Sequence, residues 1–126
     1  MALNVLVTDD SAVMRAMIIR TLRMTEVEIG EVRQAANGAE ALAVLDEEWI
    51  DLALIDINMP VMNGIELLAT MATRPYAGGV RTIVVSTEGS DPRIAEVKSY
   101  GAEFVHKPFT PEALREVVLR LTGVTS

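Results

Sequence analysis

The sequence predicts an α/β fold: a five-stranded parallel sheet that is doubly wound, with helices on both of its faces. Short apolar runs alternate with longer stretches of helical periodicity, and this strand–helix unit recurs five times along the 126 residues. The third run, residues 52–56, is apolar on both faces, which is typical of a central parallel strand. Because crossovers between parallel strands are right-handed, the helices then cover both faces of one sheet.

Each predicted strand is a short run of mainly apolar residues. The predicted strands occupy residues 3–7, 31–35, 52–56, 81–86 and 103–106. The second of them has the weakest apolar pattern. Turn and cap residues separate every strand from the helix that follows it, as a repeated strand–helix unit requires.

The predicted helices begin at residues that can cap a helix N-terminus. Ser11 caps the first helix, and Asn37 caps the second with Glu40 three residues later, as in a capping box. A third helix is predicted over residues 65–73, and Gly64 before it is predicted to occupy a turn with positive φ. The residues predicted for the inner faces of the first two helices are Met14, Met17, Ile18, Thr21, Leu22, Leu42, Leu45 and Trp49.

The last two helices are each predicted to begin with a cap followed by proline. Asp91 is the predicted cap of the fourth helix, with Pro92 at its first position and Gly101 at its end. Thr110 and Pro111 have the same roles at the start of the fifth helix. The apolar stripe of that helix follows i, i+3, i+4, i+7 spacing and consists of Leu114, Val117, Val118 and Leu121.

The composition fits one domain and argues against several kinds of function. A chain of 126 residues that is 50% hydrophobic suits a single core, so residues 1–126 are interpreted as one domain without an output domain. A net charge of −7 argues against nucleic-acid binding, and the lack of cysteine excludes disulfides and thiolate metal sites. No apolar run approaches the ~20 residues of a membrane span and no basic leader is present, so we expect a cytoplasmic protein without membrane insertion.

Acidic, hydroxyl and basic side chains lie at or just beyond the ends of four of the predicted strands, and the carboxyl ends of parallel strands meet at one edge of a sheet. These side chains are Asp9, Asp10, Asp56, Ser86, Glu88 and Lys107. Two carboxylates about 4 Å apart repel by roughly 4 kcal/mol at an effective dielectric of about 20. One lysine does not neutralise three of them, whereas Mg²⁺, which prefers oxygen ligands, does. The sequence therefore predicts Mg²⁺ at Asp9 and Asp10, with Asp56 free to act as a nucleophile that forms an aspartyl phosphate.

Four motifs carry a resemblance to a known family. TDDSAVMR, LALIDINMPVMNGIEL, IVVSTEG and EFVHKPFT, in this order and spacing, resemble the receiver domain of bacterial response regulators, of the single-domain, chemotaxis (CheY-like) type. The resemblance covers essentially the whole chain. It implies a flavodoxin-like sheet with strand order 2-1-3-4-5, and a phosphorylation-switched binding module rather than an enzyme, although one that supports its own phosphoryl transfer and autodephosphorylation.

The resemblance implies a role for each residue near the metal. Asp56 is the phosphoacceptor, and Lys107 contacts an oxygen of the phosphoryl group. The metal ligands are Asp9, Asp10, Asp56 and the backbone carbonyl of Asn58. The implied cofactor is Mg²⁺, with Mn²⁺ as an alternative ion.

Further residues are implied to control the switch and its lifetime. Ser86 is the switch hydroxyl that follows the phosphoryl group, and Phe104 is the switch aromatic. Asn58 and Glu88, two residues after the phosphoacceptor and two after the switch hydroxyl, tune dephosphorylation. The bond between Lys107 and the following proline is expected to be cis.

The resemblance also implies partners. We expect a monomer that receives its phosphoryl group from a sensor histidine kinase, and the candidate downstream partners are a flagellar motor switch protein, a phosphatase and a histidine-phosphotransfer protein. Chemotaxis is the favoured role. The alternative is a stand-alone relay receiver that passes phosphoryl groups to a histidine-phosphotransfer protein or regulates a kinase.

Two other classes of protein fit the residues less well. A phosphohydrolase with an aspartate nucleophile requires a second acid two residues later, where this chain has Asn58. A flavodoxin-type cofactor binder requires a phosphate loop rich in hydroxyl groups and glycine after the first strand. This chain has TDDSAV there, and its two carboxylates repel a phosphate.

Overall fold

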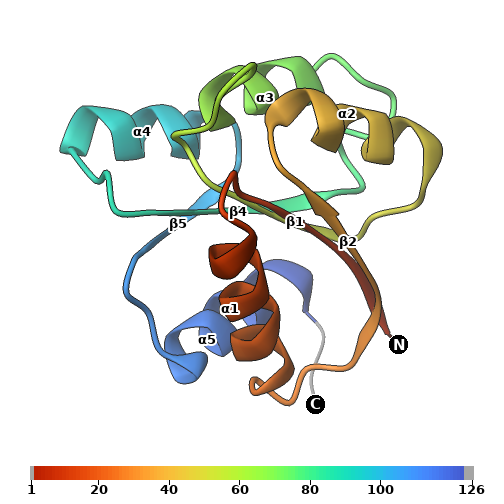
Figure 1. The fold of residues 1–126 in the computed structure, drawn as a ribbon, viewed down its shortest axis with the longest axis vertical. Helices are drawn as coiled ribbons and strands as arrows, with labels where there is room; N and C mark the ends of the chain where they lie inside the picture. The colour runs from red at the N-terminus through yellow and green to blue at the C-terminus, as the bar shows by residue number, and fades with distance from the viewer. Residues whose placement is uncertain (1, 124–126) are drawn as a thin grey trace.

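The computed structural model describes residues 2–123 and contains the predicted doubly wound parallel sheet (Figure 1). The five strands are β1 (Leu3–Thr8), β2 (Ile29–Ala35), β3 (Leu52–Ile55), β4 (Arg81–Ser86) and β5 (Glu103–His106). They lie in the order β2-β1-β3-β4-β5, and every neighbouring pair is parallel. The fold class is therefore confirmed, as is the strand order that the resemblance implied.

The five helices divide between the two faces of the sheet. They are α1 (Ala12–Arg23), α2 (Gly38–Glu47), α3 (Gly64–Met71), α4 (Asp91–Ser99) and α5 (Pro111–Thr122). Figure 1 shows α2, α3 and α4 on one face, with α1 and α5 on the other. Successive strand side chains point to opposite faces, so Leu6 of β1 lies in the core under α2–α4, whereas Val5 and Val7 lie in the core under α1 and α5. No helix within residues 2–123 is long and apolar enough to span a membrane.

Three of the predicted N-terminal caps are confirmed. The Ser11 hydroxyl accepts a hydrogen bond from the backbone N–H of Met14 at 3.2 Å, at the start of α1. The side chains of Asn37 and Thr110 accept the corresponding bonds at the starts of α2 and α5. These bonds satisfy N–H groups that the helices leave unpaired, and they fix where each helix leaves the edge of the sheet.

Two predicted inner-face residues are exposed instead. Met17 of α1 is 53% exposed and Trp49 is 67% exposed. Because α2 ends at Glu47, Trp49 lies outside the helical phase that would have turned it inward. Its indole N–H donates to Oδ1 of Asp51 at 2.8 Å, so the ring lies over the surface.

The predicted start of α4 is wrong by one residue. Ser90 holds the N-cap position, and Asp91 and Pro92 are the first and second helical residues. The Ser90 side chain makes no capping hydrogen bond. The end of the helix is as predicted, with Gly101 just beyond it in the left-handed region at φ +81°.

The prediction that position 64 is glycine because a turn there has positive φ is also wrong. The residue with positive φ in the loop before α3 is Val61, at 67°, and Gly64 is not in that region. A Cβ added to Gly64 would lie 2.3 Å from the carbonyl oxygen of Asp56 and 2.9 Å from Cα of Ile57. Glycine is required here by the close approach of two backbones, which brings α3 against the end of β3.

Candidate functional site

Three carboxylates meet where β1 and β3 end. Oxygen atoms of Asp9, Asp10 and Asp56 all lie within 4.8 Å of one another, and we call this group the carboxylate cluster. Asp9 is buried, Asp56 is partly buried and Asp10 is exposed, so the cluster opens to solvent on one side. The structure thus brings together the three acids that the sequence placed at one edge of the sheet.

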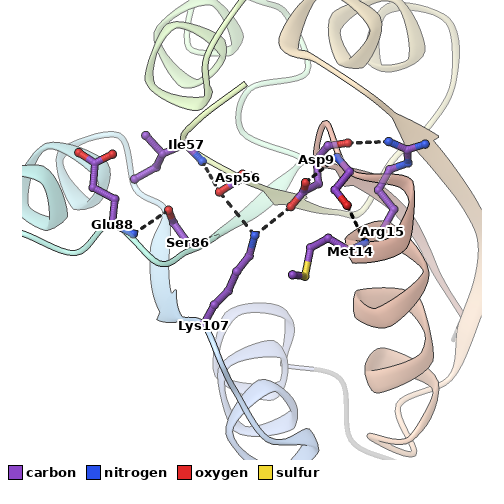
Figure 2. A network of polar contacts seen from close by, with 9 residues as sticks. Asp9, Met14, Arg15, Asp56, Ile57, Ser86, Glu88 and Lys107 are labelled. Carbon is purple, nitrogen blue, oxygen red and sulfur yellow. Dashed lines mark hydrogen bonds and ion pairs between the residues drawn. The ribbon is translucent and has the colours of Figure 1, made fainter. Parts of the chain in front are cut away.

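Lys107 enters the cluster from the end of β5. Its Nζ lies 2.9 Å from Oδ2 of Asp9 and 3.7 Å from Oδ1 of Asp56, and Figure 2 shows the ammonium group between the two carboxylates. The Lys107 side chain is 11% exposed, and those of Asp9 and Asp56 are 2% and 12% exposed. The bond from Lys107 to Pro108 is cis, as expected. One ammonium group therefore faces two largely buried carboxylates, so the cluster carries more negative than positive charge.

The start of α1 holds Asp9 in place. Oδ1 of Asp9 accepts a hydrogen bond from the backbone N–H of Ser11 at 2.9 Å. Arg15 donates from Nη1 to the backbone carbonyl of Asp9 at 2.6 Å (Figure 2). Its Nε donates to Oε1 of Gln34 at 3.0 Å. Arg15 is not among the site residues that the sequence predicted. The signal that could have revealed Arg15 is its place in the first turns of α1, four residues after the cap. A helical side chain there points back toward the helix N-terminus, and so toward β1.

Ser86 connects the cluster to the loop between β4 and α4. Its side chain is fully buried, and its Oγ accepts a hydrogen bond from the backbone N–H of Glu88 at 3.1 Å. The backbone carbonyl of Ser86 accepts from the N–H of Lys107 at 3.0 Å. The Ser86 hydroxyl also acts to lower the pKa of Asp56, so it lies close to that carboxylate. A hydroxyl group, an ammonium group and a carboxylate therefore lie around one point at the edge of the sheet.

The environment of Asp56 raises the pKa of its carboxyl group. Burial raises the pKa of Asp56 above its ordinary value, and the negative charge of Asp9 acts in the same direction. Lys107, the hydrogen bond from the backbone N–H of Ile57 and the nearby Ser86 hydroxyl oppose this rise in the pKa without cancelling it. Additional positive charge beside Asp56 would therefore favour the ionised, nucleophilic carboxylate.

The donor set of the cluster fits Mg²⁺. Carboxylate oxygens are the hard ligands that Mg²⁺ takes, and the exposed side at Asp10 leaves room for the waters that this ion retains. Asn58, whose backbone carbonyl is the expected further ligand, is exposed in the loop after β3, two residues beyond Asp56. No cysteine or histidine contributes to the cluster, so the site has the character of a Mg²⁺ or Mn²⁺ site rather than a zinc site.

The structure places the other predicted site residues farther out. Phe104 is partly buried on β5, packs against the core under α2–α4, and makes an edge contact with the ring of His106 at a centroid distance of 4.8 Å. Glu88 reaches the cluster only through its backbone, at Ser86. Figure 2 shows its carboxylate turned away from Asp56.

Comparison with known proteins gives the family. A family model described as the response regulator receiver domain matches residues 5–119. This chain belongs to the response regulator receiver family. The receiver domain is a component of two-component signalling, and receivers of this kind are switch modules that generally bind Mg²⁺.

The sequences and structures of several known proteins align with almost the whole receiver domain. It is 33% identical over 126 residues to a chemotaxis protein CheY homolog of Campylobacter jejuni, across 98% of this chain and 95% of the relative. It is 35% identical over 118 residues to the chemotaxis protein CheY of Listeria monocytogenes, across 92% and 95% of the two chains. The structure of CheY4 of Vibrio cholerae superimposes with a TM-score of 0.84 at 34% identity, across 96% and 99% of the two chains. The domain is therefore CheY-like in sequence and in fold.

Proposed function

We propose that Asp56 is the phosphoacceptor of a Mg²⁺-dependent switch, and that a sensor histidine kinase is the donor. The observation that supports this best is the carboxylate cluster around Lys107, in which oxygen atoms of three acids lie within 4.8 Å of one another. A purely structural domain gains nothing from such an arrangement, because repulsion between the carboxylates lowers its stability. A site that binds a dication and then a phosphoryl group requires it.

In the proposed transfer, an oxygen of Asp56 attacks the phosphorus of a phosphohistidine on the donor. A new P–O bond forms as the P–N bond breaks, and the bonding pair leaves with the imidazole ring, which takes up a proton. Lys107 pairs with an oxygen of the phosphoryl group as it arrives, since its ammonium group lies 3.7 Å from Oδ1 of Asp56. Mg²⁺ bound at the carboxylate cluster and the carbonyl of Asn58 would supply the remaining positive charge against the phosphoryl oxygens.

The proposed switch uses groups that surround the cluster. The added negative charge attracts the Ser86 hydroxyl as a hydrogen-bond donor, and the Phe104 ring moves into the space that Ser86 leaves. This movement biases the face formed by α4, β5 and α5 toward a partner protein. Asn58 and Glu88, polar residues that flank the site, orient the water that later removes the phosphoryl group.

Incubation with acetyl phosphate and Mg²⁺ is expected to add one phosphoryl group to the protein, as measured by intact mass. The Asp56→Asn variant should remain unmodified, because it lacks the nucleophilic oxygen, and EDTA should prevent modification of the wild type. Asp46→Asn is the matched control, since it removes a carboxylate on α2 that takes no part in the cluster. Modification that persists in both Asp56→Asn and EDTA would exclude the proposed acceptor.

We further propose an output in chemotaxis, because the relatives that match along nearly their whole length are named chemotaxis proteins. A pull-down from native lysate should retain a flagellar motor component when the protein carries Mg²⁺ and beryllofluoride, and not when it is metal-free. The reason is that beryllofluoride mimics the phosphoryl group and favours the active face. A histidine-phosphotransfer protein or kinase as the only partner in both states would instead support a relay.

A further inference from the structure

The carboxylate of Glu88 is held by an arginine of α4. Nε of Arg93 lies 3.1 Å from Oε1 of Glu88, and Nη1 of the same guanidinium lies 3.1 Å from Oε1 of Glu96. The backbone N–H of Glu88 donates to Ser86, so the residue has one end at the site and the other on α4. Figure 2 shows the carboxylate directed away from Asp56 and Lys107.

The ion pair between Glu88 and Arg93 links the loop before α4 to the first turn of the helix. Arg93 is the third residue of the helix, and the N-cap residue Ser90 makes no side-chain hydrogen bond there. The loop from Ser86 to Ser90 is therefore joined to α4 by the side chains of Glu88 and Arg93. These side chains are 35% and 37% exposed, so solvent reaches the pair and it opens and closes readily.

We infer that Arg93 is a positioning residue that prolongs the life of the aspartyl phosphate by holding the Glu88 carboxylate away from Asp56. The inference rests on the proposed function of Asp56. When the pair opens, the Glu88 carboxylate can turn toward the site and accept a proton from an attacking water. The water oxygen then bonds to phosphorus, and the bond from phosphorus to the Asp56 oxygen breaks and returns its electron pair to the carboxylate. Inorganic phosphate leaves, taking up the proton from Glu88.

The test measures the decay of the phosphorylated protein after acetyl phosphate has been removed, at saturating Mg²⁺. Arg93→Ala should accelerate the decay by about two- to five-fold, the range expected for loss of one solvent-exposed ion pair. Arg93→Lys keeps a cation beside Glu88 and should restore a rate close to that of the wild type. Glu96→Ala is the matched control, because it removes the other partner of Arg93 and leaves the pair with Glu88 intact.

Two further measurements separate positioning from a general effect on the fold. In the Glu88→Ala background, Arg93→Ala should leave the decay rate unchanged, because no carboxylate remains to be released. Raising the salt concentration should accelerate decay in the wild type more than in Arg93→Ala, since salt screens the ion pair. An Arg93→Ala rate equal to that of the wild type, or the same acceleration with and without Glu88, overturns the inference.

The same experiment distinguishes this inference from the proposed function. If no phosphoryl group is added to the wild type, the proposed function of Asp56 fails. If the phosphoryl group is added normally and its decay is insensitive to Arg93, only the role of Arg93 fails.

Discussion

Replacing Lys107 with methionine is expected to destabilise the metal-free protein by about 3 kcal/mol at neutral pH. The substitution keeps much of the side-chain volume and removes the only ammonium group that the structure places within ion-pair distance of Asp9 and Asp56 in the described chain. Removal of one partner from a buried ion pair is costly because the other charge stays buried without compensation. The free energy of unfolding, measured with urea in EDTA, tests this expectation.

The loss of stability in Lys107→Met should depend on pH in a defined direction. Burial already raises the pKa of Asp56, and Lys107 opposes that rise, so the variant should have a still higher pKa at Asp56 in the folded state. A carboxyl group with a raised folded pKa contributes most stability below its unfolded pKa, about 3.9, and loses that contribution as pH rises through the folded pKa. The difference in stability between the wild type and Lys107→Met should therefore be small near pH 4 and increase toward pH 7.

Mg²⁺ provides the control for this prediction. The lysine and a dication interact with the same carboxylate oxygens, so Mg²⁺ should stabilise Lys107→Met more than it stabilises the wild type. Lys98→Met, at an exposed position near the end of α4, should change neither the stability nor its response to Mg²⁺ appreciably. Equal unfolding free energies and equal Mg²⁺ responses in the two variants would show that Lys107 does not offset the negative charge of the carboxylate cluster.

The sequence correctly predicts which charged residues meet at the edge of the sheet, because one geometric rule fixes their positions. Asp9 and Asp56 follow buried strands, and parallel strands direct their carboxyl ends to the same edge whatever the loops do. Lys107 follows β5, two strands away from β3, and its long side chain is what lets it reach Asp9. These positions depend only on strand identity and order, which hydrophobic patterning and the family resemblance supply.

The features that the sequence did not predict depend on loop conformation. Trp49 is exposed because α2 ends two residues before it, and no glycine or proline marks that end. The pairing of Glu88 with Arg93 depends on the path of residues 87–90, which no periodic pattern encodes. Gly64 is predicted to serve a turn with positive φ because glycine adopts such φ readily, and only the three-dimensional packing of α3 on β3 shows why glycine is needed there.

The close approach at Gly64 leads to the second large effect. Gly64→Ala is expected to destabilise the protein by about 2–3 kcal/mol, because its Cβ would lie 2.3 Å from the carbonyl oxygen of Asp56 and 3.0 Å from the carbonyl carbon. The atoms in the way belong to the backbone, so no side-chain rotation relieves the overlap. Either α3 or the chain at Asp56 must move, which weakens the hydrogen bond from the N–H of Gly64 to the carbonyl of Ile57, now 2.8 Å long.

Gly78→Ala separates this contact from the general effect of replacing glycine. A Cβ at Gly78 meets no atom within 4 Å and the residue does not have positive φ, so its substitution should be neutral or stabilising by up to about 1 kcal/mol. Urea unfolding of both variants measures the difference. Because the displaced atoms are those of Asp56 itself, Gly64→Ala should also slow modification by acetyl phosphate, and Gly78→Ala should not. Equal stability and equal modification rates in the two variants would mean that the loop accommodates a methyl group, and that the position of Asp56 does not depend on the packing of α3 against it.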